Sequence, residues 1–136
     1  MIAIDTSALI AIFRLEPEAD AFLRAIVAAE ARAMSGLTLL ETSMVMSGGA
    51  RDAAALEPLD AFLREAGVEI VAFDAEHARL ARDAFLLYGK GRHKAGLNLG
   101  DCASYALAIS RSAALLFKGE DFRQTDVRAA LTMPGT

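Results

Sequence analysis

Short runs of hydrophobic residues recur along this chain, each followed by a longer segment with helical spacing. The first run, residues 1–4, has four apolar residues without polar alternation, which is typical of a strand buried on both faces of a parallel sheet. Three later runs predict further strands at residues 33–34, 68–73 and 114–117. We expect residues 68–73 to form a second buried strand.

The segments between these runs carry apolar residues three and four positions apart, as amphipathic helices do. The expected helices cover residues 7–13, 17–30, 38–47, 52–65, 74–88 and 101–112, followed by a short helix from residue 126 and an edge strand at 131–133. Strands that alternate with helices predict an α/β fold. We therefore expect residues 1–136 to form one three-layer domain, with a short central parallel sheet covered by helices.

The composition excludes some classes of protein. The chain has 14 basic and 18 acidic residues and a formal charge of −4, so any contact with nucleic acid must use a local basic patch or metal ions. A single cysteine, Cys102, excludes an intrachain disulfide and fits a reducing compartment. The N-terminal run lacks a basic flank and is interrupted by Asp5, which predicts neither a signal peptide nor a membrane span. We expect a cytoplasmic protein.

Four acidic residues stand at positions that suggest chemistry. Asp5 and Asp121 follow the predicted strands at residues 1–4 and 114–117. Asp101 lies in the first turn of a predicted helix that is apolar nearly all round. Glu41 lies within the apolar stripe of the predicted helix 38–47. In open α/β sheets, ligands bind at the carboxyl ends of the strands. All four acids lie at, or can reach, that edge.

Each acid also has an ordinary structural explanation. Asp5 and Asp101 suit helix N-caps, and Asp121 could be a loop acid. Glu41 is harder to explain, because an unpaired carboxylate that faces a core costs several kcal/mol. Carboxylates about 4 Å apart repel by roughly 4 kcal/mol per pair at an effective dielectric constant near 20. Such a cluster needs protons or a divalent cation, and oxygen ligands point to Mg²⁺ or Mn²⁺ rather than zinc.

The segments around these acids resemble one known family. MIAIDTSALI, LTLLETSMVM, LNLGDCASYALA and LLFKGEDFRQTDV together resemble the PIN-domain family, specifically the bacterial VapC-type toxins. The resemblance implies a PIN-like fold and a Mg²⁺-dependent endoribonuclease that is usually a homodimer and is inhibited by a VapB-type antitoxin. It carries the family's catalytic acids and metal ligands over to Asp5, Glu41, Asp101 and Asp121. Glu120 and Asp126 are alternatives for the fourth acid.

Candidate RNA contacts lie in the loop GKGRHKAG and beside Asp5. Lys90, Arg92 and Lys94 form the one local basic cluster, which suits phosphate contacts and equally suits a solvated surface loop. Thr6 matches the hydroxyl residue that follows the first aspartate in the family. We expect His77 on an exposed helix face.

Two other functions fit the composition. A phosphoacceptor signalling receiver domain shares the length, the α/β alternation and an acidic pocket, and Lys118 would stand at a strand end. It would need paired acids after the first strand, where only Asp5 follows. A catalytically inactive PIN-like module that only binds a partner is the second alternative.

Overall fold

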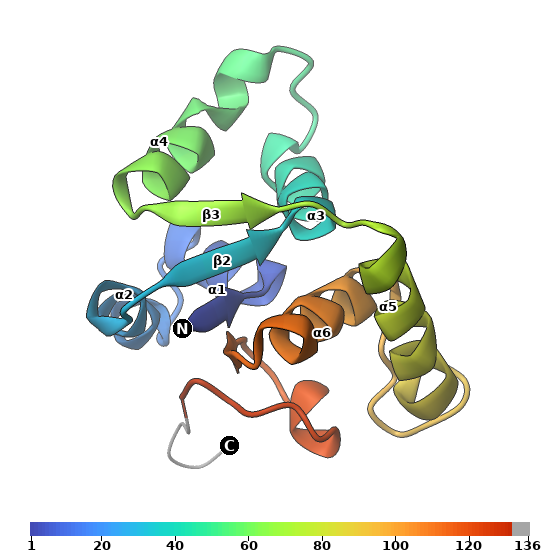
Figure 1. The fold of residues 1–136 in the computed structure, drawn as a ribbon. Helices are drawn as coiled ribbons and strands as arrows, with labels where there is room; N and C mark the ends of the chain where they lie inside the picture. The colour runs from blue at the N-terminus through green and yellow to red at the C-terminus, as the bar shows by residue number, and fades with distance from the viewer. Residues whose placement is uncertain (132–136) are drawn as a thin grey trace.

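Four parallel strands form the centre of the molecule (Figure 1). The computed structural model describes residues 1–131. The strands are β1 (Ile2–Ile4), β2 (Arg32–Ser35), β3 (Val68–Val71) and β4 (Ala114–Leu116), and their order in the sheet is β3-β2-β1-β4. Ala3 of β1 lies opposite Ala33 of β2 and Leu115 of β4. The predicted parallel α/β fold is confirmed.

Six α-helices follow the strands in the described part of the chain. They are α1 (Thr6–Phe13), α2 (Ala19–Ala28), α3 (Gly36–Ser47), α4 (Glu57–Glu65), α5 (Ala75–Tyr88) and α6 (Leu99–Arg111), and short 3₁₀ turns cover Ala53–Leu56 and Phe122–Gln124. None of these helices is long and apolar enough to span a membrane.

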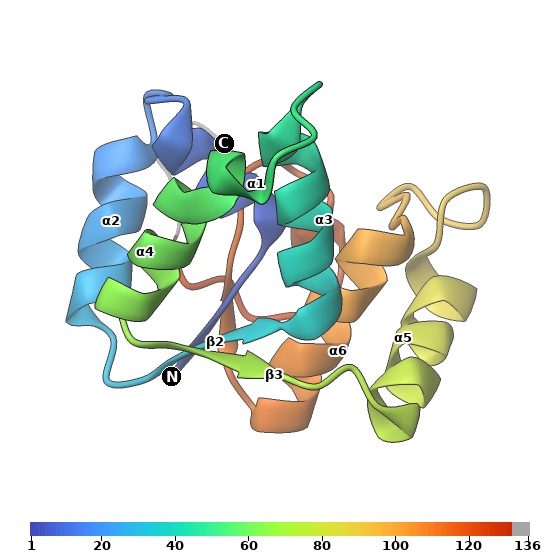
Figure 2. The same ribbon diagram turned by 90° about the horizontal axis from the view of Figure 1, so that it is seen from above.

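Two hydrophobic cores lie on opposite faces of the sheet. Successive strand residues point to opposite faces, so Ala3 and Leu115 join a core with α5 and α6, whereas Ile4 and Leu116 join a core with α1, α2 and α4. Figure 2 shows α2 and α4 on one side of the strands and α6 with α5 on the other. This arrangement accounts for the three layers predicted from the sequence.

The prediction that residues 68–73 form a buried strand is wrong in its burial. The strand there, β3, is an edge strand, and both Glu69 and Ile70 are exposed. An edge strand has one neighbour, and here its outer residues meet solvent. The predicted helix from residue 126 is also absent, because residues 122–124 form a 3₁₀ turn and Ala129 instead bridges to Leu115. The edge strand expected at 131–133 lies largely outside the described residues.

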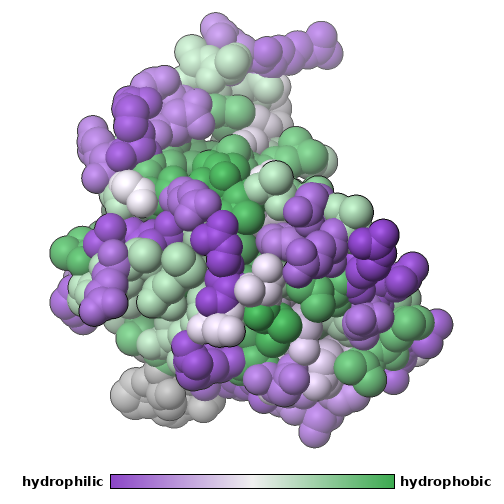
Figure 3. Space-filling model, in the orientation of Figure 1, coloured by the Kyte–Doolittle hydropathy of each residue, from purple (hydrophilic) through white to green (hydrophobic). Residues whose placement is uncertain are grey.

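Helix α3 does not bury the apolar face that its sequence predicts to be buried. The buried residues of α3 are Thr38 and Thr42, whereas Leu40 is 55% exposed and Met44 is 66% exposed. The apolar stripe around Glu41 therefore faces outward. Hydrophobic residues also reach the surface among hydrophilic ones on the face shown in Figure 3.

His77 is buried, with 5% of its surface exposed, and the centre of its ring lies 6.4 Å from the centre of the Phe73 ring. The prediction of an exposed helix face is wrong, because α5 turns this residue towards the core beneath it.

Candidate functional site

Asp5 stands at the carboxyl end of the central strand β1, where the chain turns into α1. Its side chain is 3% exposed, and both of its oxygens accept hydrogen bonds. Oδ2 accepts from the backbone N–H of Ser7 (3.0 Å) and from its hydroxyl (2.6 Å), and Oδ1 accepts from the Ser104 hydroxyl (2.6 Å). Asp5 is thus the N-cap of α1, and its carboxylate is fixed by serines of α1 and α6.

Glu41 reaches the same place from α3. The Thr6 hydroxyl donates to Glu41 Oε1 over 2.7 Å. The Glu41 carboxylate also lies directly over Gly100 of α6, so closely that a Cβ on Gly100 would overlap it. A Cβ at this position would require the Glu41 carboxylate to move away from the helix.

Buried hydroxyl groups support both carboxylates. Each hydroxyl has one hydrogen to donate. Ser104 donates its hydrogen to Asp5, so Thr38 is the donor in the 3.2 Å contact between the Thr38 and Ser104 hydroxyls. Thr42 lies 2.9 Å from Thr6, the residue that donates to Glu41, and 2.8 Å from the Thr38 carbonyl.

This hydroxyl network was not predicted from the sequence. Two signals were present: Thr38 and Thr42 stand four residues apart on one helix, and Ser104 lies within an otherwise apolar helix. Buried hydroxyl groups need partners, so either signal could have pointed to a polar centre.

Asp101 occupies the first turn of α6, as predicted. It forms a capping box with Asn98: Asp101 Oδ2 accepts from the Asn98 backbone N–H (3.1 Å) and Asn98 Oδ1 accepts from the Asp101 N–H (2.9 Å). Burial raises the pKa of the Asp101 carboxyl to about 7, against the hydrogen bond from Asn98. The charges of Asp5, Glu41 and Asp121 contribute smaller parts of this rise in pKa.

One open cavity joins three of the four predicted acids. Asp5, Glu41 and Asp101 line it together with Thr6 and Lys118. These residues come from four separate parts of the chain that meet at the carboxyl edge of the sheet. Asp121 acts on Asp101 through its charge, although it does not line the cavity.

The alternatives for the fourth acid have partners elsewhere. Glu120 lies 3.7 Å from the Arg123 side chain. Asp126 Oδ1 accepts from the Tyr105 hydroxyl over 2.6 Å. Of these three acids, Asp121 is the one whose charge contributes to the raised pKa of Asp101.

The donor set fits a hard cation that keeps part of its water. Within residues 1–131, no three Asp, Glu, His or Cys side chains are grouped so that they could hold a metal ion together, so at most two of these acids could bind one ion directly. Mg²⁺ uses one or two carboxylates and retains several waters, which suits Asp5 and Asp101. The repulsion at Asp101 is what a bound cation would relieve.

The predicted basic loop lies outside this cavity. It is closed by hydrogen bonding between Lys90 N–H and the Leu97 carbonyl (3.0 Å), directly before α6. The Arg92 guanidinium lies 5.4 Å from the centre of the Phe85 ring. Lys90, Arg92 and Lys94 are exposed, and the loop leads into the helix that carries Asp101.

Cys102 has no role in this geometry. Its thiol is buried, and burial raises the pKa of the thiol to about 11. A thiol that is neutral near pH 7 is a poor nucleophile, so Cys102 is a core residue.

The matching family model and the similar proteins point to the same family. The PIN domain model matches residues 2–128. The chain is 47% identical over 131 residues to Ribonuclease VapC30 of Mycobacterium tuberculosis, covering 96% of this chain and 98% of the relative. It is 50% identical over 126 residues to Ribonuclease VapC of Mycolicibacterium smegmatis, covering 93% and 97%.

A solved structure of a toxin-antitoxin complex from Klebsiella pneumoniae contains a chain with a similar fold. The two chains superpose with a TM-score of 0.70 at 21% identity, and the match covers 98% of each. At this level of identity the likeness supports the fold.

The pKa of Asp101 predicts a dependence of stability on pH. A folded-state pKa of about 7, above the usual 3.8, means that the folded protein binds more protons than the unfolded chain between about pH 4 and pH 7. In EDTA, stability should therefore fall as pH rises through this window. Asp101→Asn should be more stable than wild type by about 1–2 kcal/mol at pH 8, after allowance for solvent screening, and the advantage should disappear below about pH 4.

Urea denaturation followed by circular dichroism measures this difference. Asp83→Asn, at an exposed position of α5, is the matched control and should show no such dependence. An equal effect of Asp101→Asn at all pH values would contradict the raised pKa of Asp101.

Proposed function

The chain belongs to the PIN-domain family as a VapC-type ribonuclease toxin, and from this we propose that the cavity around Asp5, Glu41 and Asp101 is a Mg²⁺- or Mn²⁺-dependent centre for endonucleolytic RNA cleavage. The observation that carries the proposal is the convergence of three carboxylates, from distant parts of the sequence, on one cavity. Burial there, with smaller contributions from neighbouring acids, raises the pKa of Asp101. The family membership excludes the signalling receiver alternative. The intact acidic set argues against an inactive binding module.

The four acids would divide the work. Asp5 and Asp101 would hold the principal ion, with Glu41 and Asp121 acting through water. When bound, the ion would lower the pKa of a coordinated water and neutralise charge on the phosphate. The chain's own contribution is positioning: Ser7 and Ser104 fix the two oxygens of Asp5, and Thr6 fixes Glu41.

Thr6 also remains a candidate for substrate contact. Its side chain lines the cavity, while its hydrogen is donated to Glu41. Any contact with RNA would therefore use its oxygen as an acceptor, and its supporting role towards Glu41 is the better founded.

We propose two protein partners, a VapB-type antitoxin and a second copy of this chain, and action in the cytoplasm. Exposed apolar surface supports the two protein partners, since large exposed hydrophobic patches mark interaction sites. One apolar groove runs beside the acidic cavity and is lined by Leu37, Leu40, Met44, Val45 and Leu99 together with Glu41, Asn98 and Gly100.

The metal centre predicts a specific loss of activity. Asp5→Asn should reduce the rate of RNA cleavage in Mg²⁺ by more than about 100-fold, the upper effect of changing a residue that only supports a metal ligand. The fold should be retained. EDTA should abolish wild-type cleavage, and added Mg²⁺ or Mn²⁺ should restore it. Asp83→Asn is the control, and full activity of Asp5→Asn or of the wild type in EDTA would refute the metal mechanism.

Replacing Gly100 should cause a second, independent loss of cleavage activity. In Gly100→Ala the new methyl group would displace the Glu41 carboxylate, so cleavage should fall to the level of Glu41→Gln. Stability should not fall, because alanine favours a helix over glycine by up to about 1 kcal/mol. Gly49→Ala, where nothing lies near the added atom, is the control. Additive losses in the Gly100→Ala, Glu41→Gln double variant would show that the two residues act separately.

The basic loop predicts a change in salt dependence. If Lys90, Arg92 and Lys94 each contact a phosphate, their triple alanine variant should reduce the slope of log Kd against log salt concentration by about 0.7 per contact on single-stranded RNA. Alanine at Arg24, Arg51 and Arg79, which are also exposed, removes the same charge elsewhere. Equal slopes for the two triple variants would reject the contact role.

A further inference from the structure

Lys118 is tied to Asp5 through the backbone. It follows β4, the neighbour of β1 in the sheet. The Lys118 N–H donates to the Ser7 hydroxyl (3.0 Å), and that hydroxyl donates to Asp5 Oδ2 (2.6 Å). The position of Lys118 is therefore fixed relative to the acid at the centre of the cavity.

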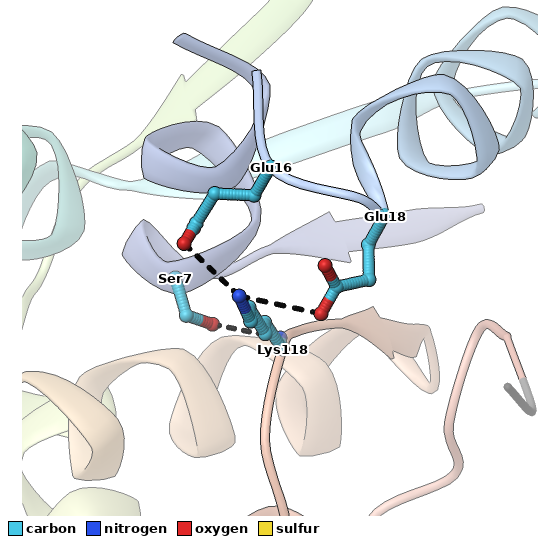
Figure 4. Close-up of polar contacts among 4 residues, drawn as sticks. All are labelled: Ser7, Glu16, Glu18 and Lys118. Atoms are coloured by element: carbon cyan, nitrogen blue, oxygen red, sulfur yellow. Dashed lines mark hydrogen bonds and ion pairs between the residues drawn. The ribbon is translucent and has the colours of Figure 1, made fainter. Parts of the chain in front are cut away.

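Two glutamates hold the side chain of Lys118 (Figure 4). Its Nζ lies 3.0 Å from Glu16 Oε2 and 3.3 Å from Glu18 Oε2. Both glutamates come from the connection between α1 and α2, which turns sharply at Leu15 (φ 53°). The Glu16 N–H donates to the Ala11 carbonyl (2.9 Å) and anchors this turn.

The ammonium retains capacity for another partner. A lysine ammonium has three N–H donors, and two are used by Glu16 and Glu18. The Lys118 side chain is 35% exposed and lines the same cavity as Asp5 and Asp101. Among the residues that line this cavity, all of them within the described chain, it is the only cation.

We propose that Lys118 is an RNA-binding residue of the cleavage site, which donates its remaining N–H to a phosphate oxygen of the RNA while Glu16 and Glu18 hold the ammonium in place. The inference rests on the proposed ribonuclease function and deepens it. Partly exposed ion pairs add little to stability, so a purely structural role explains poorly why Glu16, a further acid lining the cavity, pairs with Lys118 there. The hydrogen bond from Lys118 to Glu16 raises the pKa of Lys118, which keeps the ammonium charged.

Salt-dependent RNA binding tests the contact. The probe is a fluorescein-labelled single-stranded RNA of 12 nucleotides with mixed sequence, bound in Ca²⁺ and checked by gel for integrity, with anisotropy measured over a series of NaCl concentrations. Lys118→Met should reduce the slope of log Kd against log salt concentration by about 0.7, the value for one lost phosphate contact. Lys118→Arg should retain the wild-type slope.

Neutral phosphates locate the contact. A set of probes with one methylphosphonate each should contain a position that weakens binding to wild type but not to Lys118→Met. No such position, or an unchanged slope for Lys118→Met, would overturn the proposal.

The variant Glu16→Gln, Glu18→Gln separates phosphate binding from a structural clamp. It removes both ion pairs but keeps the lysine charge, so the slope should stay at or above the wild-type value. If it lowers the slope as Lys118→Met does, the lysine only holds the turn and the proposal fails. Wild-type protein that does not bind the probe would also overturn it, whereas binding without cleavage in Mg²⁺ would count against the ribonuclease function alone.

Discussion

The burial of carboxylates close together at the carboxyl edge of the sheet is the constraint on which the rest of this molecule depends. Burial and three neighbouring acids raise the pKa of Asp101 to about 7, so the metal-free site is a source of instability. The rest of the fold supplies what the site lacks. Two hydrophobic cores fix the strands and helices from which the acids project, and neutral hydroxyl groups orient Asp5 and Glu41 without adding charge.

The strands and the acids could be predicted because each leaves a local signal. A short apolar run bounded by turn residues is consistent with a strand, and a strand lies at each of the four runs, although β3 is exposed at the edge of the sheet. The acids follow from the same reasoning, since parallel strands end at one edge. Asp5, Glu41 and Asp101 were expected to meet there, and they line one cavity.

What could not be predicted depends on contacts between distant segments. The apolar stripe of α3 predicts the wrong buried face, because the protein buries Thr38 and Thr42 beside their hydrogen-bond partners Thr6 and Ser104. The exposure of β3 depends on its place at the edge of the sheet. His77 is buried by the packing of α5, which its own neighbours in the sequence do not reveal.

The bare backbone at Gly100 has a consequence for how this protein can evolve. Every missense change in a glycine codon adds a side chain, and at this position the first added carbon falls where the Glu41 carboxylate lies. The Glu41 carboxylate would then have to move away from α6, so such changes would alter the acidic centre directly. Selection for the acidic centre would therefore also act on Gly100.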